Sequence, residues 1–292
     1  MQILIITRWQ TGATITSEIF NRNPKFAYFY EPLWDIIGDN ASKDQALNLH
    51  KAASCDISFT THKWKNWWQT CKYSKIVEQT GLCNKLPGPV GQNKSSEMVQ
   101  AVSKACRQNQ RHVAIKTVRI PDMSYIKDIV SDSKLNVKVL YIVRDPRAIS
   151  VARHLTEGVP EMELNECDEI RNNLRYWKDP PDWLKGRHVI LRYEDFADDP
   201  KLMAQKLYDI LGLGQVPQSV KSWLNSNLFI NQNSIDGSYY WRRKLDFKRM
   251  LEIQARFKDV MSLLGYEAIT SQEDLKDSKI PTLKKVNYPL MS

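Results

Sequence analysis

Apolar and polar positions along this chain are grouped in blocks that predict an α/β protein. Short runs rich in β-branched and other apolar residues predict five strands, at Ile3–Thr7, Phe26–Tyr30, Val113–Val118, Val137–Val143 and Val189–Arg192. Apolar residues recur at helical spacing over Met123–Val130, Met162–Trp177, Lys201–Leu211 and Phe247–Leu264. The Val137–Val143 run is interrupted only by Lys138, as expected of a strand buried on both faces of a parallel sheet. The pattern therefore predicts a central parallel sheet flanked by helices.

A charged turn follows the Val137–Val143 strand. Its residues are Arg144, Asp145, Pro146 and Arg147, after which a helix can run on. Asp before Pro is suited to be an N-cap with Pro at the first helical position. Ligands of open α/β sheets bind outside the carboxyl ends of the strands, and guanidinium groups beside a helix N-terminus attract phosphate or sulfate. The alternative is an ordinary turn whose Asp–Arg pairs lie on the surface.

The first strand also leads through a polar turn into a helical pattern. Residues 8–14 read RWQTGAT, and Gly12 allows the backbone to approach a ligand closely. The GK[ST] ending of a Walker A loop is missing, which argues against a nucleoside kinase. A plain strand-to-helix turn is the competing interpretation.

Two further residues have the character of catalytic groups. Glu31 follows an aromatic strand, and a carboxylate beside apolar groups can serve as a general base, although a lone Glu before Pro is more often a surface charge. Lys116 lies inside an apolar strand, where a lysine is costly unless it meets an anion. A third group, Trp241-Arg242-Arg243-Lys244, is either a solvated face or a clamp for a phosphate.

Composition narrows the class of ligand. The chain has 292 residues with a net charge of +9, which favours an anionic ligand. Nine tryptophans and twelve tyrosines suit nucleic-acid bases and sugar rings equally, but no basic helix or RNA-binding motif appears, so we expect no nucleic-acid partner. No apolar stretch approaches 18 residues, so no transmembrane segment is predicted in this chain.

The cysteines bear on the compartment. Cys55, Cys71, Cys83, Cys106 and Cys167 have no CxxC spacing, which argues against zinc and allows two disulfides with one free thiol. We predict at least one disulfide among the first four, which suits an oxidising, lumenal setting. Sequons at Asn40 and Asn93 are weak support for a glycoprotein of a secretory compartment. Either the chain is a trimmed lumenal domain or the protein lacks a targeting segment.

The chain is expected to form a single domain over residues 1–270. Within it, a polar and irregular stretch at about residues 40–110 is read as an insertion. The tail at residues 271–292 is charged and is expected to be loosely ordered.

The motifs line up, in order, with a known family. The chain resembles the Golgi carbohydrate sulfotransferases, in particular the N-acetylglucosamine/galactose 6-O-sulfotransferase and chondroitin 6-sulfotransferase group. The resemblance covers about Ile3 to Tyr266, and its matching pieces are Trp9-Gln10-Thr11-Gly12, Glu31-Pro32-Leu33-Trp34, Ile115-Lys116-Thr117-Val118-Arg119, Leu135-Asn136-Val137-Lys138-Val139, Val143-Arg144-Asp145-Pro146-Arg147-Ala148, Arg192-Tyr193-Glu194-Asp195-Phe196, Trp241-Arg242-Arg243-Lys244-Leu245 and Leu263-Leu264-Gly265-Tyr266.

The resemblance implies a P-loop-NTPase-like sulfotransferase fold and a Golgi-lumenal enzyme. Such enzymes transfer the sulfuryl group of 3′-phosphoadenosine 5′-phosphosulfate (PAPS) to a sugar hydroxyl, here a 6-hydroxyl of GlcNAc, Gal or GalNAc, without a metal. The basic surface suits a glycan acceptor that is already sulfated. The acceptor sugar, the disulfide pairing and the oligomeric state stay open. The resemblance implies that the 5′-phosphosulfate is bound by Arg8, Gln10, Thr11, Gly12, Ala13 and Thr14. Arg144 would bind the 3′-phosphate and Tyr193 the adenine, with Trp241 and Arg242 as further cofactor contacts. Glu31 would be the general base, and Lys116 would contact the sulfuryl group.

Three departures from the family pattern involve four residues. Gln10 stands where the family usually has Arg, Ala13-Thr14 stands for Ser-Ser, and Ala152 occupies the position of a serine in the 3′-phosphate motif. Arg8 could replace the missing arginine. These departures support an alternative hypothesis, a catalytically degenerate glycan- or nucleotide-binding relative with the same fold.

Overall fold

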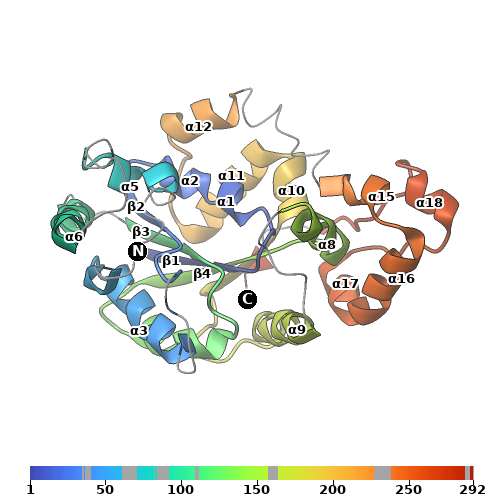
Figure 1. Cartoon of the computed structure of the whole chain (residues 1–292), viewed down its shortest axis with the longest axis horizontal. Helices are drawn as coiled ribbons and strands as arrows, with labels where there is room; N and C mark the ends of the chain where they lie inside the picture. Colours follow the sequence, from blue (N-terminus) through green and yellow to red (C-terminus); the bar gives the residue numbers. More distant parts are fainter. Residues whose placement is uncertain are drawn as a thin grey trace.

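Five parallel strands and a short antiparallel one form the central sheet of the computed structural model (Figure 1). The structure describes residues 1–34, 36, 41–60, 71–81, 83, 92–108, 112–156, 164–226, 238–286 and 290–291. The sheet order is β2-β3-β1-β4-β5-β6, in which only the β5–β6 pair is antiparallel. The strands are β1 (Gln2–Thr7), β2 (Phe26–Tyr30), β3 (His112–Thr117), β4 (Val137–Val143), β5 (His188–Arg192) and β6 (Leu290–Met291). The predicted α/β sheet is confirmed, with the five parallel strands within one residue of their expected bounds.

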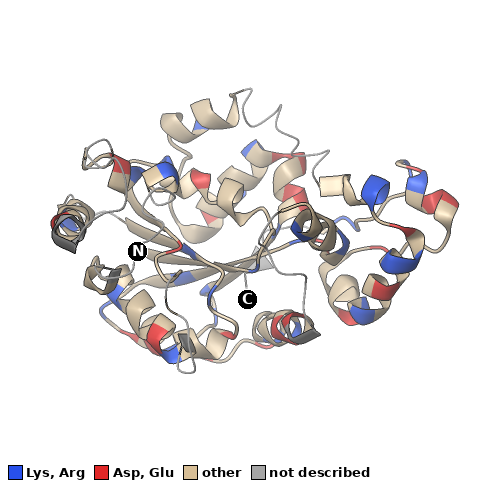
Figure 2. Cartoon of the chain, in the orientation of Figure 1, with Lys and Arg blue, Asp and Glu red and all other residues tan. Residues whose placement is uncertain are grey.

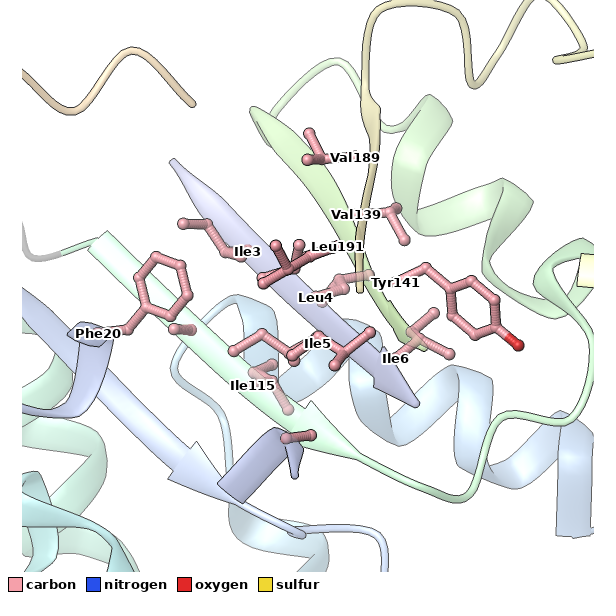
Figure 3. Close-up of a cluster of buried hydrophobic side chains, with 14 of the residues drawn as sticks. Ile3, Leu4, Ile5, Ile6, Phe20, Ile115, Val139, Tyr141, Val189 and Leu191 are labelled. Atoms are coloured by element: carbon pink, nitrogen blue, oxygen red, sulfur yellow. The ribbon is translucent and has the colours of Figure 1, made fainter. Parts of the chain in front are cut away.

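The strands are apolar because helices cover both faces of the sheet. The side chains of Ile3–Ile6 are fully buried, and they pack against residues of β3, β4 and β5 (Figure 3). In Figure 1, α1 (Ala13–Thr16), α2 (Glu18–Asn21), α10 (Tyr193–Asp198) and α11 (Pro200–Leu211) lie on one side, and α3 (Ala41–Ala53) and α9 (Leu164–Lys178) lie on the other. This doubly wound arrangement leaves the carboxyl ends of the strands as the edge where loops meet.

The remaining elements connect or extend these layers. They are η1 (Ser58–Thr60), α5 (Lys75–Glu78), α6 (Gln92–Arg107), η4 (Met123–Ile126), α7 (Lys127–Ser131), α8 (Pro146–His154), α12 (Gln218–Leu224), α15 (Trp241–Lys244), α16 (Phe247–Arg256), α17 (Lys258–Leu264) and α18 (Gln272–Lys276). Basic and acidic residues are interspersed along the helices of both layers (Figure 2).

Local capping fixes several helix ends where the sequence predicts them. Asp145 is the N-cap of α8, its carboxylate accepting from the Arg147 N–H, with Pro146 at the first helical position. Gly212 and Gly265 end α11 and α17 in the left-handed conformation, which glycine adopts without a steric penalty. The expected single helix 247–264 is instead divided at Phe257, which leaves the helical region with φ −103° and ψ 17°.

The segment after Thr270 differs from the expected loose tail. Residues 272–276 form α18, whose Leu275 is buried, and Leu283 bridges to Tyr266. Residues 290–291 form β6, which adds to the edge strand β5. Apolar contacts and an open sheet edge therefore order parts of a segment whose composition is charged. The division into one domain with an insertion stays a prediction.

Two disulfides link residues of the segment between β2 and β3. Cys55, just after α3, is bonded to Cys106 near the end of α6, and Cys71 is bonded to Cys83. The predicted disulfide among these cysteines is thereby confirmed, and the buried Cys167 is a free thiol. Asn40 lies outside the described residues. Within the described part of the chain, no helix has both the length and the hydropathy of a membrane span.

Candidate active site

Residues that directly follow the parallel strands gather at one edge of the sheet. Ile6 of β1 lies opposite Thr117 of β3, and Thr7 lies opposite Ile142 of β4, so the carboxyl ends are level. The residues that follow the five ends are Arg8, Glu31, Val118, Arg144 and Tyr193. The chain leaves β1 toward β2 on one side and leaves β4 toward β5 on the other, which is the position where open α/β sheets bind ligands.

Glu31 and Lys116 form a buried ion pair at this edge. The Lys116 Nζ lies 2.7 Å from Glu31 Oε1, and the Val118 N–H donates to Glu31 Oε2 at 3.1 Å. Both side chains are nearly inaccessible to solvent. Lys116 thus finds the anion that a lysine in an apolar strand requires. The sequence indicated a carboxylate beside apolar groups, and the structure adds a charged partner for Glu31 from the adjacent strand.

The backbone at Glu31 is held in an unusual conformation. Its φ is 46°, a left-handed value that few residues other than glycine adopt. The Glu31 N–H donates to the Lys116 carbonyl at 2.9 Å, continuing the β2–β3 pairing by one residue. The turn therefore directs the carboxylate across β3, and strain of this kind is concentrated at functional sites.

Tyr30 connects this pair to the loop after β1. The Lys116 ammonium lies 4.8 Å from the centre of the Tyr30 ring, and the Tyr30 hydroxyl is hydrogen-bonded to Thr14. Burial raises the pKa of Tyr30 above its ordinary value, with the Lys116 charge acting in the opposite direction. The contacts bring the two candidate catalytic residues and the 8–14 loop into one site.

The 8–14 loop has the geometry of an anion-binding turn. Gln10 and Gly12 both have positive φ, at 63° and 77°, and turns of this kind present successive backbone N–H groups to an anion. The Thr11 hydroxyl donates to the Arg8 carbonyl at 3.1 Å, which tightens the loop. A Cβ at Gly12 would lie only 2.2 Å from the Tyr193 ring, so glycine is required for this close approach.

Arg144 lies between the loop and Tyr193. Its Nη1 donates to the Gln10 carbonyl at 2.8 Å, and its guanidinium carbon lies 4.9 Å from the centre of the Tyr193 ring. The structure thus brings together Gly12, Arg144 and Tyr193, the residues for which the resemblance implies contacts with one nucleotide.

Arg8 is engaged away from the loop. Its guanidinium pairs with Glu166 at 3.2 Å and Glu169 at 2.5 Å, both from α9. Glu166 is in turn held by two bonds from Arg153. The two carboxylates hold the Arg8 side chain against α9. It is therefore not positioned to replace the arginine that the family usually has at position 10.

Two of the positions that depart from the family pattern, Gln10 and Ala152, are joined by hydrogen bonds through a third residue that no sequence motif indicated. The Gln10 side-chain amide donates to the Thr156 hydroxyl at 3.2 Å, and that hydroxyl donates to the Ala152 carbonyl at 2.8 Å. Gln10 and Ala152 are therefore bridged by Thr156 at the end of α8. No motif marks Thr156, because the bridge joins residues almost 150 positions apart.

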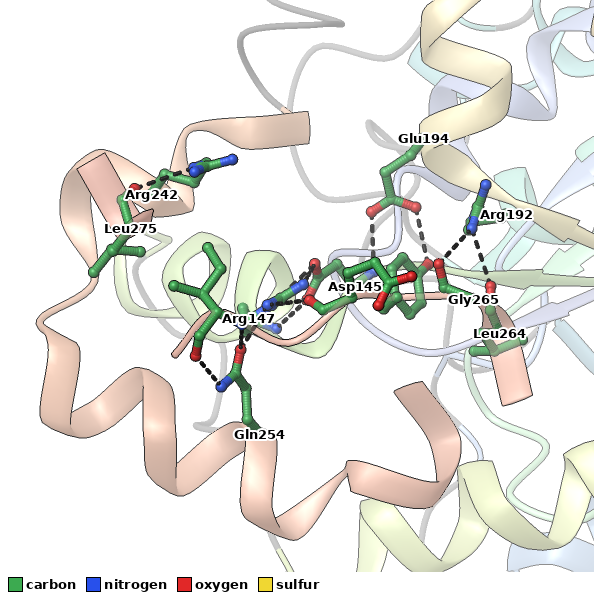
Figure 4. Close-up of polar contacts among 12 residues, drawn as sticks. Asp145, Arg147, Arg192, Glu194, Arg242, Gln254, Leu264, Gly265 and Leu275 are labelled. Carbon is green, nitrogen blue, oxygen red and sulfur yellow. Dashed lines mark hydrogen bonds and ion pairs between the residues drawn. The ribbon is translucent and has the colours of Figure 1, made fainter. Parts of the chain in front are cut away.

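Trp241 and Arg242 belong to a different part of the molecule. Trp241 is buried in a cluster that includes Met250 and Leu275. The Arg242 guanidinium donates to the Leu275 carbonyl at 3.1 Å (Figure 4). It also donates to the backbone carbonyls of Ile280, at 2.7 Å, and of Asp274 and Asp277. These bonds hold the C-terminal segment in place, which corrects the expectation that the two residues contact the cofactor.

A buried carboxylate next to Tyr193 was also not predicted. Glu194 accepts from the Asp145 N–H and from the Tyr266 hydroxyl, each at 2.9 Å (Figure 4). Burial, and then the charge of Asp145, raise the pKa of Glu194 to about 7. Its position in the Arg-Tyr-Glu-Asp segment was visible in the sequence, but its contacts come from distant elements.

One aromatic and cationic cluster completes the edge. Trp9 of the loop, Trp34 of the turn after Glu31 and Arg119 after β3 contact one another. Within the described ranges, no group of three or more His, Cys, Asp or Glu side chains is arranged to hold a metal ion.

Comparison with known proteins decides the family. The sulfotransferase domain model matches residues 1–234. The chain belongs to the sulfotransferase family. It is 26% identical to carbohydrate sulfotransferase 1 of Danio rerio, over 98% of this chain and 82% of the relative, and 25% identical to carbohydrate sulfotransferase 3 of Mus musculus, over 97% and 71%.

Solved structures of sulfotransferases are more distant from this member of the family. A mouse sulfotransferase, SULT7A1, solved in complex with PAP, is 13% identical over 89% of this chain and 83% of its own, with a TM-score of 0.46. The sulfotransferase domain of an olefin synthase from Synechococcus PCC 7002 is 13% identical over 92% and 96%, with a TM-score of 0.45. The assignment to the family rests on the sequence match.

Proposed function

We propose that this protein is a carbohydrate O-sulfotransferase that uses PAPS as sulfuryl donor and a sugar hydroxyl as acceptor. The observation that carries the proposal is the Glu31–Lys116 pair, buried beside the Gly12 loop at the carboxyl edge of the sheet. The sulfotransferase domain match and the carbohydrate sulfotransferase names of its relatives support the class of reaction and the class of acceptor.

The donor fits the residues present at this edge. Gly12 allows the Tyr193 ring to approach the 8–14 loop closely, so the loop and the ring can line one donor site. Thr11, Ala13 and Thr14 complete that loop, and Arg144 offers a guanidinium beside an aromatic ring. We assign the 5′-phosphosulfate to the loop, the 3′-phosphate to Arg144 and the adenine to Tyr193.

The chemistry supplied by the donor is an activated sulfuryl group. Glu31 would accept the proton of the sugar hydroxyl at a carboxylate oxygen, since each oxygen can accept more than the one hydrogen bond it already has. Lys116 would place its ammonium against the negative charge that develops on the sulfuryl oxygens. Burial of both groups excludes water, which would otherwise compete with the sugar.

The disulfides and the relatives support the setting that we propose. Two disulfides within the described residues suit an oxidising compartment, and we assign the protein to the Golgi lumen as a glycoprotein. The acceptor we propose is a 6-hydroxyl of GlcNAc, Gal or GalNAc in a glycan.

The test is transfer of label from PAPS to a panel of such glycans by the folded protein. Transfer to at least one acceptor is the expected result, and no transfer to any would overturn the proposal. Calorimetry with 3′-phosphoadenosine 5′-phosphate (PAP) separates the alternative, a degenerate relative, which the contacts of Gln10 and Arg8 favour. Micromolar binding supports the enzyme, whereas a relative that has lost the donor site gives no detectable binding.

A further inference from the structure

Trp9, Trp34 and Arg119 form a cluster that none of the roles above uses; we call it the Trp–Arg cluster. The centres of the two indole rings lie 5.0 Å apart, with the ring planes at 71°. The Arg119 guanidinium carbon lies 4.7 Å from the centre of the Trp34 ring and 5.6 Å from that of Trp9. All three residues are partly exposed, so the cluster forms part of the surface.

Short chain connections place the Trp–Arg cluster beside the Glu31–Lys116 pair. Trp34 lies in the turn that begins at Glu31, and its N–H donates to the Glu31 carbonyl at 3.1 Å. Arg119 follows Val118, whose N–H is bonded to the Glu31 carboxylate. The ends of β1, β2 and β3 each contribute one member, so a molecule bound to the cluster lies next to the proposed base.

The chemistry of the Trp–Arg cluster suits an acidic sugar. An indole ring offers a flat apolar face against which the C–H groups of a sugar ring can pack, with a polar N–H at its edge. The planar guanidinium group presents N–H donors in a fork that matches two oxygens of a sulfate or carboxylate. The contact with the two rings also restricts the arginine before it binds, which lowers the entropy cost of binding.

We propose that the Trp–Arg cluster is the acceptor subsite and that it binds an acidic residue of the glycan, with the sugar ring on the indoles and its anionic group on Arg119. This inference rests on the proposed function and states which acceptors the enzyme prefers. The anionic group is either a sulfate ester or a uronate carboxylate, since both present paired oxygens to a guanidinium.

The test compares Arg119→Met with the wild type on matched acceptors. One pair is a sulfated, uronate-free oligosaccharide of GlcNAc and Gal and its desulfated form; the other is a chondroitin oligosaccharide and its carboxyl-reduced form. We expect kcat/KM to fall about ten- to a hundred-fold for the acidic member of at least one pair, which identifies the anion, and to stay within about three-fold for the neutral members. The affinity for PAP should not change. Arg119→Gln serves the same comparison if the methionine variant does not fold.

Arg22 supplies a matched control, because its guanidinium carbon lies 5.1 Å from the centre of the Trp223 ring in another part of the chain. Arg22→Met should leave the preference among acceptors unchanged. Equal losses on acidic and neutral acceptors would show that the Trp–Arg cluster only supports the fold, and no loss on either would show that Arg119 does not contact the acceptor. Both results overturn the inference, as does a wild type that transfers only to neutral acceptors.

Failure of the proposed function is distinguished by a binding measurement. If the wild type transfers sulfuryl to no acceptor, calorimetry with the same acidic oligosaccharides tests the Trp–Arg cluster alone. Binding by the wild type that Arg119→Met weakens at least ten-fold supports the subsite. An absence of binding, or binding that Arg119→Met leaves intact, overturns it.

Discussion

Cations at the strand ends and cations of the C-terminal region have different partners. At the strand ends, Arg119 and Arg144 stack on the rings of tryptophan and tyrosine, and Lys116 pairs with a single carboxylate. The C-terminal region, residues 238–286, covers two other arginines, Arg147 of α8 and Arg192 at the end of β5, and both are fully buried. Arg147 is bonded to Asp145, Gln254 and the Glu267 carbonyl, and Arg192 to Asp195 and three backbone carbonyls (Figure 4).

The difference separates structural arginines from those suited to a ligand. An arginine bonded to several backbone carbonyls has its donors used by the fold, and removing it leaves buried acceptors unsatisfied. Arg119 and Arg144 instead lie against aromatic rings at the carboxyl edge of the sheet, where we propose that the acceptor and the donor bind. Arg144 and Arg147 stand three residues apart in one turn, yet one contacts the 8–14 loop and the other lies under Trp241. The motif alone therefore does not tell which arginine serves which purpose.

The largest effect is expected from Glu31→Gln. The amide keeps the shape of the side chain and an oxygen acceptor for Lys116, but it cannot accept the proton of the sugar hydroxyl. General-base catalysis contributes typically ~10²–10⁴-fold, so kcat should fall by about that factor. Transfer assays with PAPS measure the change, and calorimetry with PAP checks that the donor site is intact, with an affinity near that of the wild type. A variant with full turnover would show that another group takes the proton.

In the C-terminal region, Arg147→Met should lower the free energy of unfolding. The substitution leaves Asp145 as a buried carboxylate without its cation, a change that costs about 3–5 kcal/mol. Denaturant unfolding measures it. Arg171→Met is the matched control, because Arg171 is likewise paired with carboxylates, those of Asp168 and Asp259, but lies at the surface, where such pairs contribute about 0–1 kcal/mol. Equal losses in the two variants would contradict the distinction drawn here.

Local rules predicted most of the sheet because each strand carries its own signal. The strands at residues 26–30 and 137–143 begin and end where their apolar runs begin and end, as predicted. The N-cap at Asp145 and the left-handed Gly212 follow from side-chain and backbone preferences within a few residues. The strand β6 was missed, since two residues carry no periodicity and the pairing depends on the free edge of β5.

The candidate site was predictable only in part for the same reason. Strand ends place Glu31, Arg144 and Tyr193 at one edge, and parallel topology brings them together. The partners of each side chain depend on contacts between distant residues, such as Arg8 with Glu166. Sequence patterns depend on neighbours along the chain. The ion pairs of Arg8 with α9 and the hydrogen bonds of Arg242 join distant residues, so they could not be predicted from such patterns.

A smaller effect, on pH dependence, is expected at the boundary between the two regions. Burial raises the pKa of Glu194 to about 7 from an ordinary 4.5, so the folded protein keeps this proton after the unfolded chain has lost it. The contribution of Glu194 to stability is thus complete below pH 4.5, decreases as the pH rises to 7 and is constant above. Glu194→Gln should remove a decrease on the order of 2 kcal/mol between pH 5 and 7.

Denaturant unfolding of both proteins across this range checks the expectation. His188 has the opposite tendency, because burial lowers its pKa to about 4, so its effect appears as pH falls below 6.5. That effect is present in wild type and variant alike and cancels in the difference between them. Parallel stability curves would show that Glu194 is ionised in the folded protein over the whole range.

The last expected effect, about ten- to a hundred-fold in affinity, compares one arginine from each region directly. Arg144→Ala should weaken PAP binding by that factor, because a charged hydrogen bond worth ~1.5–3 kcal/mol to the 3′-phosphate is lost. Binding of adenosine 5′-phosphosulfate, which lacks that phosphate, should weaken far less. Arg242→Ala should reduce stability, since four carbonyls lose their donor, but leave the PAP affinity of the folded protein within about two-fold. Calorimetry on both variants decides the matter. If Arg144→Ala weakened the binding of both nucleotides equally, the 3′-phosphate would not bind at Arg144. If Arg242→Ala lowered PAP affinity ten-fold, Arg242 would belong to the donor site.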